Sequence, residues 1–294
     1  MIRKKIDSQP LSLTIEPNNL CNLKCVMCPY QHMKRKKESM PFDLYKKIID
    51  QAADLGCKDV NFTQYNEPLT DRLLFERIKY AKGKGMETRF YSNGTLLLSN
   101  DNINKLLLNP PDKIRFSFDA LTKEVYEKIR RGANYERVVK GIIQLYKERE
   151  KKGLKLPHIE VYFTVLKINK HEVKEFLKFW KGKCDFATIY MADSRNDDEK
   201  NKFKLYDQKK RKFYPCFNPK SPIIFSNGKI ALCCVDVDGF MDLGDLKSEK
   251  LKDILNSKKF KEIYKAHMNG DPHLSVCKNC SKGYVDMAFS WWNQ

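Results

Sequence analysis

The stretch EPNNLCNLKCVMCPY, residues 16–30 of this 294-residue chain, carries three cysteines in the spacing C-x3-C-x2-C. It follows directly on LSLTI (residues 11–15), a run with the β-branched and aliphatic character of a strand. Cys21, Cys25 and Cys28 can therefore present three thiolates from one loop. The pattern favours a 4Fe-4S cluster over structural zinc, because zinc takes four ligands and no fourth ligand follows nearby.

Alternating strand-like and helix-like stretches predict the fold around this loop. Strands are expected at residues 11–15, 59–63, 87–92, 113–118, 159–166 and 186–191. Helices are expected at residues 42–55, 72–84, 101–108, 122–151 and 171–181, where apolar residues return at three- and four-residue steps. This order indicates an α/β fold with a parallel sheet wound by right-handed crossovers, either open or closed into a partial barrel. In both architectures the active site lies at the carboxyl ends of the strands.

The last third of the chain has a different character, and we expect two domains, residues 1–200 and 201–294. SPIIFSNGKIALCC (221–234) predicts a β-hairpin that turns at Asn227-Gly228. Apolar positions within 251–264 predict one amphipathic helix.

Charge and composition limit the compartment and the partners. The formal net charge is +19, and the most basic stretches are Met33–Ser39 and Lys200–Tyr214. Such a charge can attract nucleic acid, anionic lipid or a phosphorylated substrate. The lysines are nevertheless spread over nearly every expected helix, which favours solvated surfaces. No secretion signal and no apolar run of membrane-spanning length occurs, so we expect a cytoplasmic protein with reduced thiols.

The three-cysteine motif and the expected fold resemble the radical S-adenosylmethionine (SAM) superfamily along the whole chain. The resemblance implies a partial (β/α)6 TIM-like barrel in which Cys21, Cys25 and Cys28 hold a 4Fe-4S cluster. In that family SAM chelates the fourth iron through its amino and carboxylate groups. An electron, supplied by a reduced flavodoxin or ferredoxin, cleaves SAM to a 5'-deoxyadenosyl radical that abstracts hydrogen from the substrate.

Two further segments resemble SAM-binding segments of the family. Asn66 and Glu67, in the stretch Tyr65–Pro68, stand where the family has Gly-Gly-Glu-Pro, which holds the amino group of SAM; both glycines are missing here. Ser92 and Asn93 precede a glycine and resemble the family's Thr-Asn-Gly segment.

The remaining SAM contacts are implied at single positions. Ser117 and Asp119 resemble residues near the ribose, and Arg130 resembles the arginine that reaches the carboxylate. Met27 stands where the family usually has an aromatic residue beside the adenine, and its polarizable thioether can pack there.

A second cysteine set consists of Cys216, Cys233, Cys277 and Cys280. By spacing alone, four thiolates suit structural zinc or a fully ligated iron-sulfur cluster. The set resembles the twitch domain, a truncated SPASM domain, and this resemblance implies one auxiliary 4Fe-4S cluster. Cys234 is a reserve ligand, whereas Cys57 and Cys184 are expected to be small buried hydrophobic residues.

A fully ligated auxiliary cluster has no open iron, so we expect it to accept or relay an electron. This arrangement resembles the twitch-bearing 2-deoxy-scyllo-inosamine dehydrogenase and implies radical oxidation of a substrate that bears hydroxyl or amino groups. Arg195 and Tyr190 are candidate catalytic residues facing the cavity. The base itself is not assigned.

Three alternatives stay open. One is a radical SAM peptide maturase, although the roughly ten residues before the first strand are few for a leader-binding domain. Another is a redox-neutral epimerase or mutase. The third, from a different class, is a metal-stabilised nucleic-acid-binding protein, which the positive charge favours.

Overall fold

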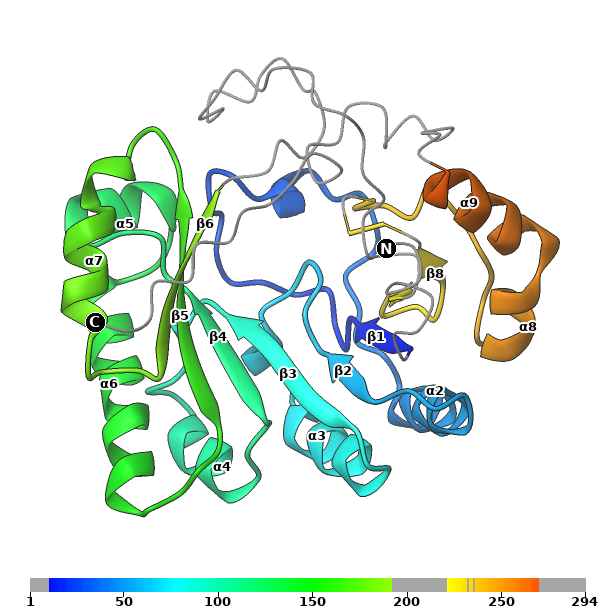
Figure 1. The fold of residues 1–294 in the computed structure, drawn as a ribbon, viewed down its shortest axis with the longest axis horizontal. Coiled ribbons are helices and arrows are strands. Elements are labelled where there is room, and N and C mark those ends of the chain that lie inside the picture. The colour runs from blue at the N-terminus through cyan, green and yellow to red at the C-terminus, as the bar shows by residue number, and fades with distance from the viewer. Residues whose placement is uncertain (1–10, 192–220, 232, 235, 270–294) are drawn as a thin grey trace.

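The computed structural model describes residues 11–191, 221–231, 233, 234 and 236–269. Its centre is one curved sheet with helices along the outer face (Figure 1). Six strands are parallel: β1 (Ser12–Ile15), β2 (Asp59–Asn61), β3 (Glu87–Ser92), β4 (Lys113–Ser117), β5 (His158–Val165) and β6 (Phe186–Met191). They lie in the order β6-β5-β4-β3-β2-β1, so each strand pairs with its neighbour in the sequence. The predicted α/β partial barrel is confirmed.

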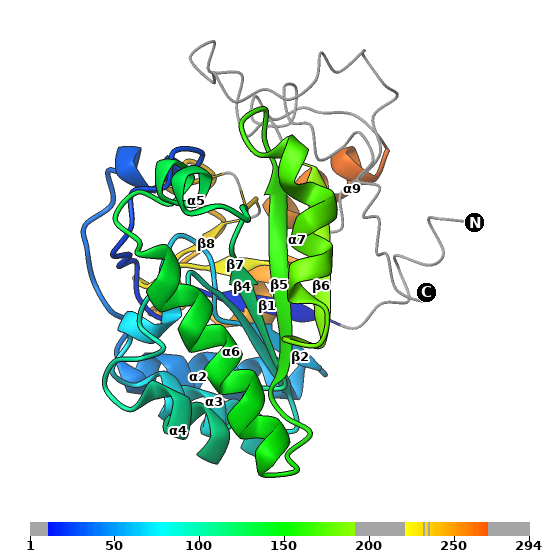
Figure 2. The same ribbon diagram turned by 90° about the vertical axis from the view of Figure 1, so that its left-hand side faces the viewer.

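Helices follow the strands and cover the outer face of the sheet. They are α2 (Phe42–Asp54), α3 (Leu74–Gly83), α4 (Asn102–Leu108), α5 (Lys123–Ile129), α6 (Tyr135–Lys151) and α7 (Val173–Trp180), with short 3-10 turns η1 (Pro29–His32), η2 (Pro68–Thr70) and η3 (Lys170–Glu172). Figure 2 looks onto the side where α6 and α7 lie in front of the sheet. Across the described residues, no helix combines the length and apolar character needed to cross a membrane.

Alternating side chains give the sheet its two faces. In β4, Ile114 and Phe116 are buried, whereas Lys113, Arg115 and Ser117 are only half-buried. The buried set packs against the helices in one large apolar core. The other set lies on the concave face, where polar side chains are available to a ligand.

The helix expected over residues 122–151 is wrong, because two helices occupy this range. Arg130 ends α5, Gly132 has φ of +95°, and the Asn134 side chain accepts a hydrogen bond from Arg137 N to begin α6. A left-handed glycine followed by an asparagine N-cap ends one helix and starts another. The break places Arg130 at the edge of the concave face.

The predicted hairpin is confirmed, and it extends the same sheet. Strand β7 (Ile223–Ile224) is antiparallel to β8 (Ile230–Ala231) and parallel to β1 on its other side. The boundary expected between residues 200 and 201 lies outside the described residues.

The single C-terminal helix expected over residues 251–264 is wrong. Helices α8 (Leu251–Asn256) and α9 (Lys258–Met268) meet at Ser257, whose backbone is extended and whose Oγ accepts a hydrogen bond from Phe260 N. A serine with this geometry starts a new helix.

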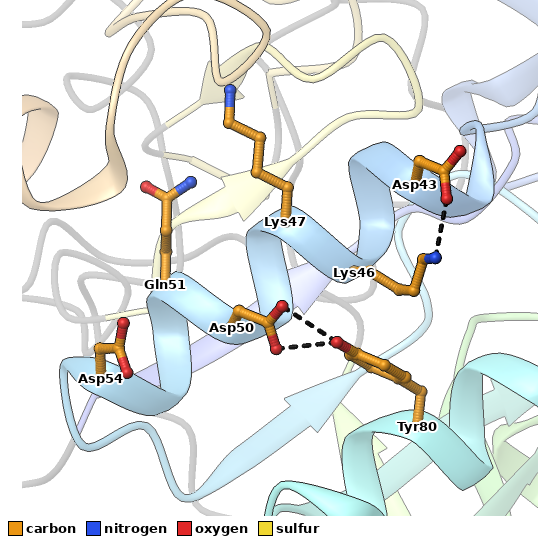
Figure 3. A pocket seen from close by; sticks show the side chains of 7 residues that line it. All are labelled: Asp43, Lys46, Lys47, Asp50, Gln51, Asp54 and Tyr80. Atoms are coloured by element: carbon orange, nitrogen blue, oxygen red, sulfur yellow. Dashed lines mark hydrogen bonds and ion pairs between the residues drawn. The ribbon is translucent and has the colours of Figure 1, made fainter.

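Helix α2 joins the C-terminal segment to the barrel. Lys47 Nζ donates to Leu246 O at 2.8 Å, and Gln51 Oε1 accepts from Leu251 N at 2.7 Å. Figure 3 shows these two side chains on one side of α2, while Asp50 faces Tyr80 on the other. Most residues that line the surface hollow drawn there pair with one another or with neighbouring elements. It belongs to the outer face of the fold.

Candidate functional site

The cysteine loop, residues 21–28, follows β1 and is fixed to the end of α5 by its main chain. Lys24 N donates to Arg131 O at 3.0 Å, and Val26 N donates to Ile129 O at 3.0 Å. The break between α5 and α6 therefore supplies acceptors for the loop. The three predicted iron ligands lie within a segment that is held at both the β1 and the α5 side.

Two thiols of this loop, those of Cys21 and Cys25, are poorly suited to ionise on their own. Burial raises the pKa of the Cys21 thiol to about 12 and also raises the pKa of Cys25, although Arg130 Nη1, at 3.6 Å from Cys25 Sγ, opposes the second shift. Iron binds thiolates, so its positive charge must replace these protons. In the described part of the chain no group of three possible ligands is placed to hold a metal ion. A 4Fe-4S cluster spreads its ligands, because each thiolate binds its own iron.

A buried carboxylate lies beside the loop, at the end of β2. Glu67 Oε1 accepts hydrogen bonds from Ser92 Oγ at 2.8 Å and Leu69 N at 3.1 Å, while Oε2 accepts from Asn93 N at 2.6 Å. Glu67 N donates to Leu20 O at 2.7 Å. The structure thus brings together predicted residues from the ends of β2 and β3 and ties them to the start of the cysteine loop.

The Glu67 carboxylate is held without a cation. Burial raises its pKa to about 7, against the opposing effect of its hydrogen bonds and of the Arg130 charge. No basic side chain among the described residues forms an ion pair with it. A buried carboxylate of this kind favours a ligand that brings a positive or hydrogen-donating group.

Asn22 joins the cysteine loop to β3, and the sequence reasoning missed it. Its Oδ1 accepts from Asn93 Nδ2 at 2.9 Å, and its Nδ2 donates to Thr95 Oγ1 at 2.8 Å. Gly94, between these partners, has φ of +75°, and a Cβ there would lie 2.9 Å from Val138 of α6. The position of Asn22 directly after the first cysteine was the feature of the sequence that could have identified it as a residue of the site.

Arg130 and Asp119 form an ion pair on the other side of the cysteine loop. Arg130 Nη2 binds Asp119 Oδ2, while Asp119 Oδ1 accepts from Thr164 N at 2.7 Å. Asp119 is fully buried and has φ of +68°, which an aspartate tolerates better than most residues. The buried Nε of Arg130 has no hydrogen-bond partner among the described residues. The guanidinium thus retains a donor for an anionic group.

The other predicted SAM contacts lie in the same region. The Asn66 side chain closes a turn by accepting from Gln64 N at 2.9 Å and donating to Phe62 O at 3.2 Å. Ser117 ends β4 on the concave face, and Met27 is half-buried within the cysteine loop. These positions do not test the roles assigned to the three residues, which stay predictions.

Of the two candidate catalytic residues, Tyr190 lies in β6 and Arg195 falls outside the described residues. The Tyr190 ring stacks on Tyr162 with centroids 5.5 Å apart, and Tyr162 contacts Tyr91 edge-on at 5.5 Å. Arg115 donates to the Tyr91 hydroxyl at 2.7 Å. Three tyrosines in contact through their rings and the guanidinium of Arg115 therefore line the concave face of β3 to β6.

From the second cysteine set, Cys233 lies in the described residues, whereas Cys216, Cys277 and Cys280 do not. Cys233 is half-buried, and the neighbouring Cys234 packs against the apolar cluster of Ile223, Phe225 and Ala231. Cys57 and Cys184 are buried, as predicted.

Part of the basic stretch 33–39 is not a solvated surface. Arg35 binds the fully buried Glu16 through two nitrogens, at 2.7 and 2.9 Å, and its guanidinium lies 3.9 Å from the centre of the Phe225 ring. Arg35 Nε also donates to Val237 O at 2.7 Å. The stretch Lys200–Tyr214 lies outside the described residues.

Comparison with solved structures supports the fold over nearly the whole chain. BtrN, in a crystal structure with AdoMet and 2-DOIA, aligns with a TM-score of 0.62 at 18% identity and covers 93% of each chain. Streptococcus suis SuiB, bound to the precursor peptide SuiA, aligns with a TM-score of 0.71 at 16% identity over 95% of this chain and 72% of its own.

Sequence relatives match a little over half of the chain. A Pyrococcus furiosus tungsten-containing aldehyde ferredoxin oxidoreductase cofactor-modifying protein is 29% identical over 57% of this chain and 47% of its own length. A probable GTP 3',8-cyclase of Methanococcus maripaludis is 33% identical over 53% of this chain and 48% of its own. The chain thus spans about half the length of the curated relatives it matches.

Two family models match. Residues 216–281 match SPASM, an iron-sulfur cluster-binding domain, and residues 15–179, more than half of the chain, match the Radical SAM superfamily. The matches agree with the predicted cofactors, which are SAM, a 4Fe-4S cluster in the barrel and an auxiliary iron-sulfur cluster. The chain therefore belongs to the radical SAM superfamily.

Proposed function

We propose that this radical SAM enzyme oxidises a substrate bearing hydroxyl or amino groups and passes one electron to an auxiliary 4Fe-4S cluster. The observation that carries the proposal is the pair of unsatisfied groups on either side of the cysteine loop. Among the described residues, the buried Glu67 carboxylate has no ion-pair partner and the buried Nε of Arg130 has no acceptor. Together they are complementary to the amino and carboxylate groups of an amino acid such as SAM.

Each residue of the barrel site has a role in this proposal. Cys21, Cys25 and Cys28 hold the first cluster, Glu67 receives the amino group of SAM, and Arg130 receives its carboxylate. Asp119 acts by orienting Arg130, because both of its oxygens are already bound.

The remaining residues support SAM or its binding segments. Ser92 and Asn93 fix Glu67 through the hydrogen bonds to its carboxylate. Asn66 shapes the turn before Glu67, Ser117 lies near the ribose, and Met27 packs on the adenine.

SAM, when bound, supplies the hydrogen-abstracting 5'-deoxyadenosyl radical after one electron arrives from the first cluster. With SAM bound, the substrate carbon would lose one hydrogen atom to this radical, giving 5'-deoxyadenosine. The hydroxyl or amino group of the substrate would release a proton to water, and the auxiliary cluster, when bound, would supply the acceptor for one electron. The substrate is thereby oxidised by two electrons to a carbonyl or imine.

The C-terminal residues supply the electron acceptor in this scheme. Cys233 with Cys216, Cys277 and Cys280 holds the auxiliary cluster, and the packing of Cys234 into an apolar cluster supports Cys233 as the ligand of the two. Tyr190 and Arg195 contact the substrate. The fold likeness to BtrN, whose structure holds AdoMet and 2-DOIA, supports a small polar substrate.

A second candidate is maturation of a peptide. The likeness to SuiB bound to its precursor peptide favours it. The same radical step would serve both functions, so the substrate decides between them.

Reconstitution under anaerobic conditions tests the proposal. The full chain should bind about eight irons, four for each cluster, and should convert SAM to 5'-deoxyadenosine when reduced with dithionite. Aminocyclitols and synthetic peptides are then offered in parallel, and mass spectrometry detects loss of two hydrogens from the substrate. Zinc at the second site, or a product of unchanged mass, would overturn the oxidation, and absence of 5'-deoxyadenosine would overturn the radical step itself.

A further inference from the structure

Two hydrogen bonds connect the segment before Glu67 to the main chain of Cys234, which is next to the predicted ligand Cys233. The carbonyl oxygen of Cys234 accepts from Tyr65 Oη at 2.8 Å and from Gln64 Nε2 at 3.2 Å. Tyr65 is 3% exposed. Two side chains from the end of β2 thus bind one peptide group next to Cys233.

The residues that donate these bonds directly precede the SAM-binding segment. Gln64 N donates to Asn66 Oδ1 at 2.9 Å, and Glu67 follows one residue later with its carboxylate bound to β3. A displacement of the Cys234 carbonyl would therefore be transmitted along three residues to Glu67. The family pattern has glycine at the position of Tyr65, and a glycine could not make this bond.

The link is braced by the buried Glu16. Its Oε1 accepts from Tyr65 N at 3.4 Å, and its Oε2 accepts from Ser226 N at 3.3 Å and from Ser226 Oγ at 3.4 Å. Arg35 neutralises the same carboxylate. Arg35, Tyr65 and Ser226, which are far apart in the sequence, thus all bind the side chain of Glu16.

We propose that Tyr65 and Gln64 are positioning residues that hold the main chain beside Cys233 against the segment carrying Glu67. They thereby fix the auxiliary cluster in distance and orientation relative to SAM. The inference rests on the proposed function, because it takes Cys233 as a ligand of an electron-accepting cluster. Hydrogen-bond donors near an iron-sulfur cluster also favour its reduced, more negative state.

Removing each of the two hydrogen-bond donors separately tests the inference. Tyr65→Phe keeps the ring, and Gln64→Leu removes the second donor at similar size. In the reconstituted full chain, each variant should shift the midpoint potential of the auxiliary cluster to a more negative value. Each should also change the magnetic interaction between the two reduced clusters in the electron paramagnetic resonance spectrum, and the double variant should do both more strongly.

Tyr80→Phe is the matched control, because its hydroxyl donates to Asp50 on the outer face and should leave both quantities unchanged. Wild-type potential and spectrum in both Tyr65→Phe and Gln64→Leu would overturn the inference alone. A wild-type chain without a second cluster signal would instead overturn the proposed function. If one variant loses the auxiliary iron, the other carries the measurement.

Discussion

The cysteine loop at residues 21–28 and the segment around Cys233 differ in how far apart along the chain their parts lie. The loop carries its three thiols within eight residues and sits on strand ends that follow one another in the sequence. The ligand set predicted to include Cys233 extends in the sequence from Cys216 to Cys280, and the neighbouring Cys234 is hydrogen-bonded to the distant Tyr65. The predicted ligands of the first site are thus close together in the sequence, whereas those of the second are widely separated, and the segment around Cys233 contacts residues distant in the sequence.

The largest expected effect is the selective loss of iron from the cysteine loop at residues 21–28. Cys25→Ala should abolish SAM cleavage and remove about four irons, because a cluster with two remaining thiolates is not retained. The auxiliary iron should stay. Iron analysis and chromatography of 5'-deoxyadenosine check this outcome.

Cys184→Ala is the control for that experiment, since Cys184 is buried in the core away from the loop. It should keep both clusters. Wild-type rates of SAM cleavage in Cys25→Ala would contradict the assignment of the barrel site.

The converse experiment removes the predicted ligand Cys233 of the auxiliary cluster. Cys233→Ala should lose about four irons and the two-electron oxidation while the first cluster remains, because each closed site needs its full thiolate set. Cys234→Ala, its matched neighbour, should keep about eight. Retained iron in Cys233→Ala together with loss in Cys234→Ala would exchange the two assignments.

Arg35, which binds Glu16 and the carbonyl oxygen of Val237, allows a test of the contact between the N-terminal segment and the segment around Cys233. Arg35→Met leaves the fully buried Glu16 without its cation and should destabilise the fold by about 3 kcal/mol. Thermal unfolding should report a Tm lower by roughly 5–10 °C. Lys34→Met, next to it and exposed, keeps its main-chain bond to Asp238 and should unfold like the wild type. Equal Tm values for the two variants would show that the ion pair does not join the regions.

A smaller effect concerns the protonation of Glu67. A hydrogen-donating ligand favours the ionised carboxylate, so SAM binding should weaken as the pH falls through about 7. Glu67→Gln should bind SAM roughly tenfold more weakly at pH 8 and lose this pH dependence. Equilibrium dialysis with labelled SAM measures both. An unchanged pH profile in the variant would assign the titration to another group.

The same comparison explains what the sequence could and could not predict. The six strands and the cysteine loop follow from alternation and spacing within short windows, and their predicted places agree with the structure to within two residues. Glu67, Ser92 and Asn93 were expected separately, and the parallel order of β2 and β3 explains why they meet.

Other features were not predicted, because each depends either on a single residue or on a contact between residues far apart in the sequence. Gly132 and Asn134 break the helix expected over 122–151, and the break could have been predicted from these two residues. The bond from Tyr65 to Cys234 could not be predicted, because it joins residues 169 positions apart that the pairing of β7 with β1 brings together. Local patterns carry no information about such pairings.

The pairing of β7 with β1 also bears on how the chain is made. Strand β1 leaves the ribosome before the other described strands, and β2 soon covers one of its edges. The other edge pairs with β7, where Thr14 meets Ile223. Until β7 is synthesised, this edge lacks its strand partner, and an unpaired edge invites association with other nascent chains. Growth temperature and chaperone supply should thus govern the yield of this protein before any iron is inserted.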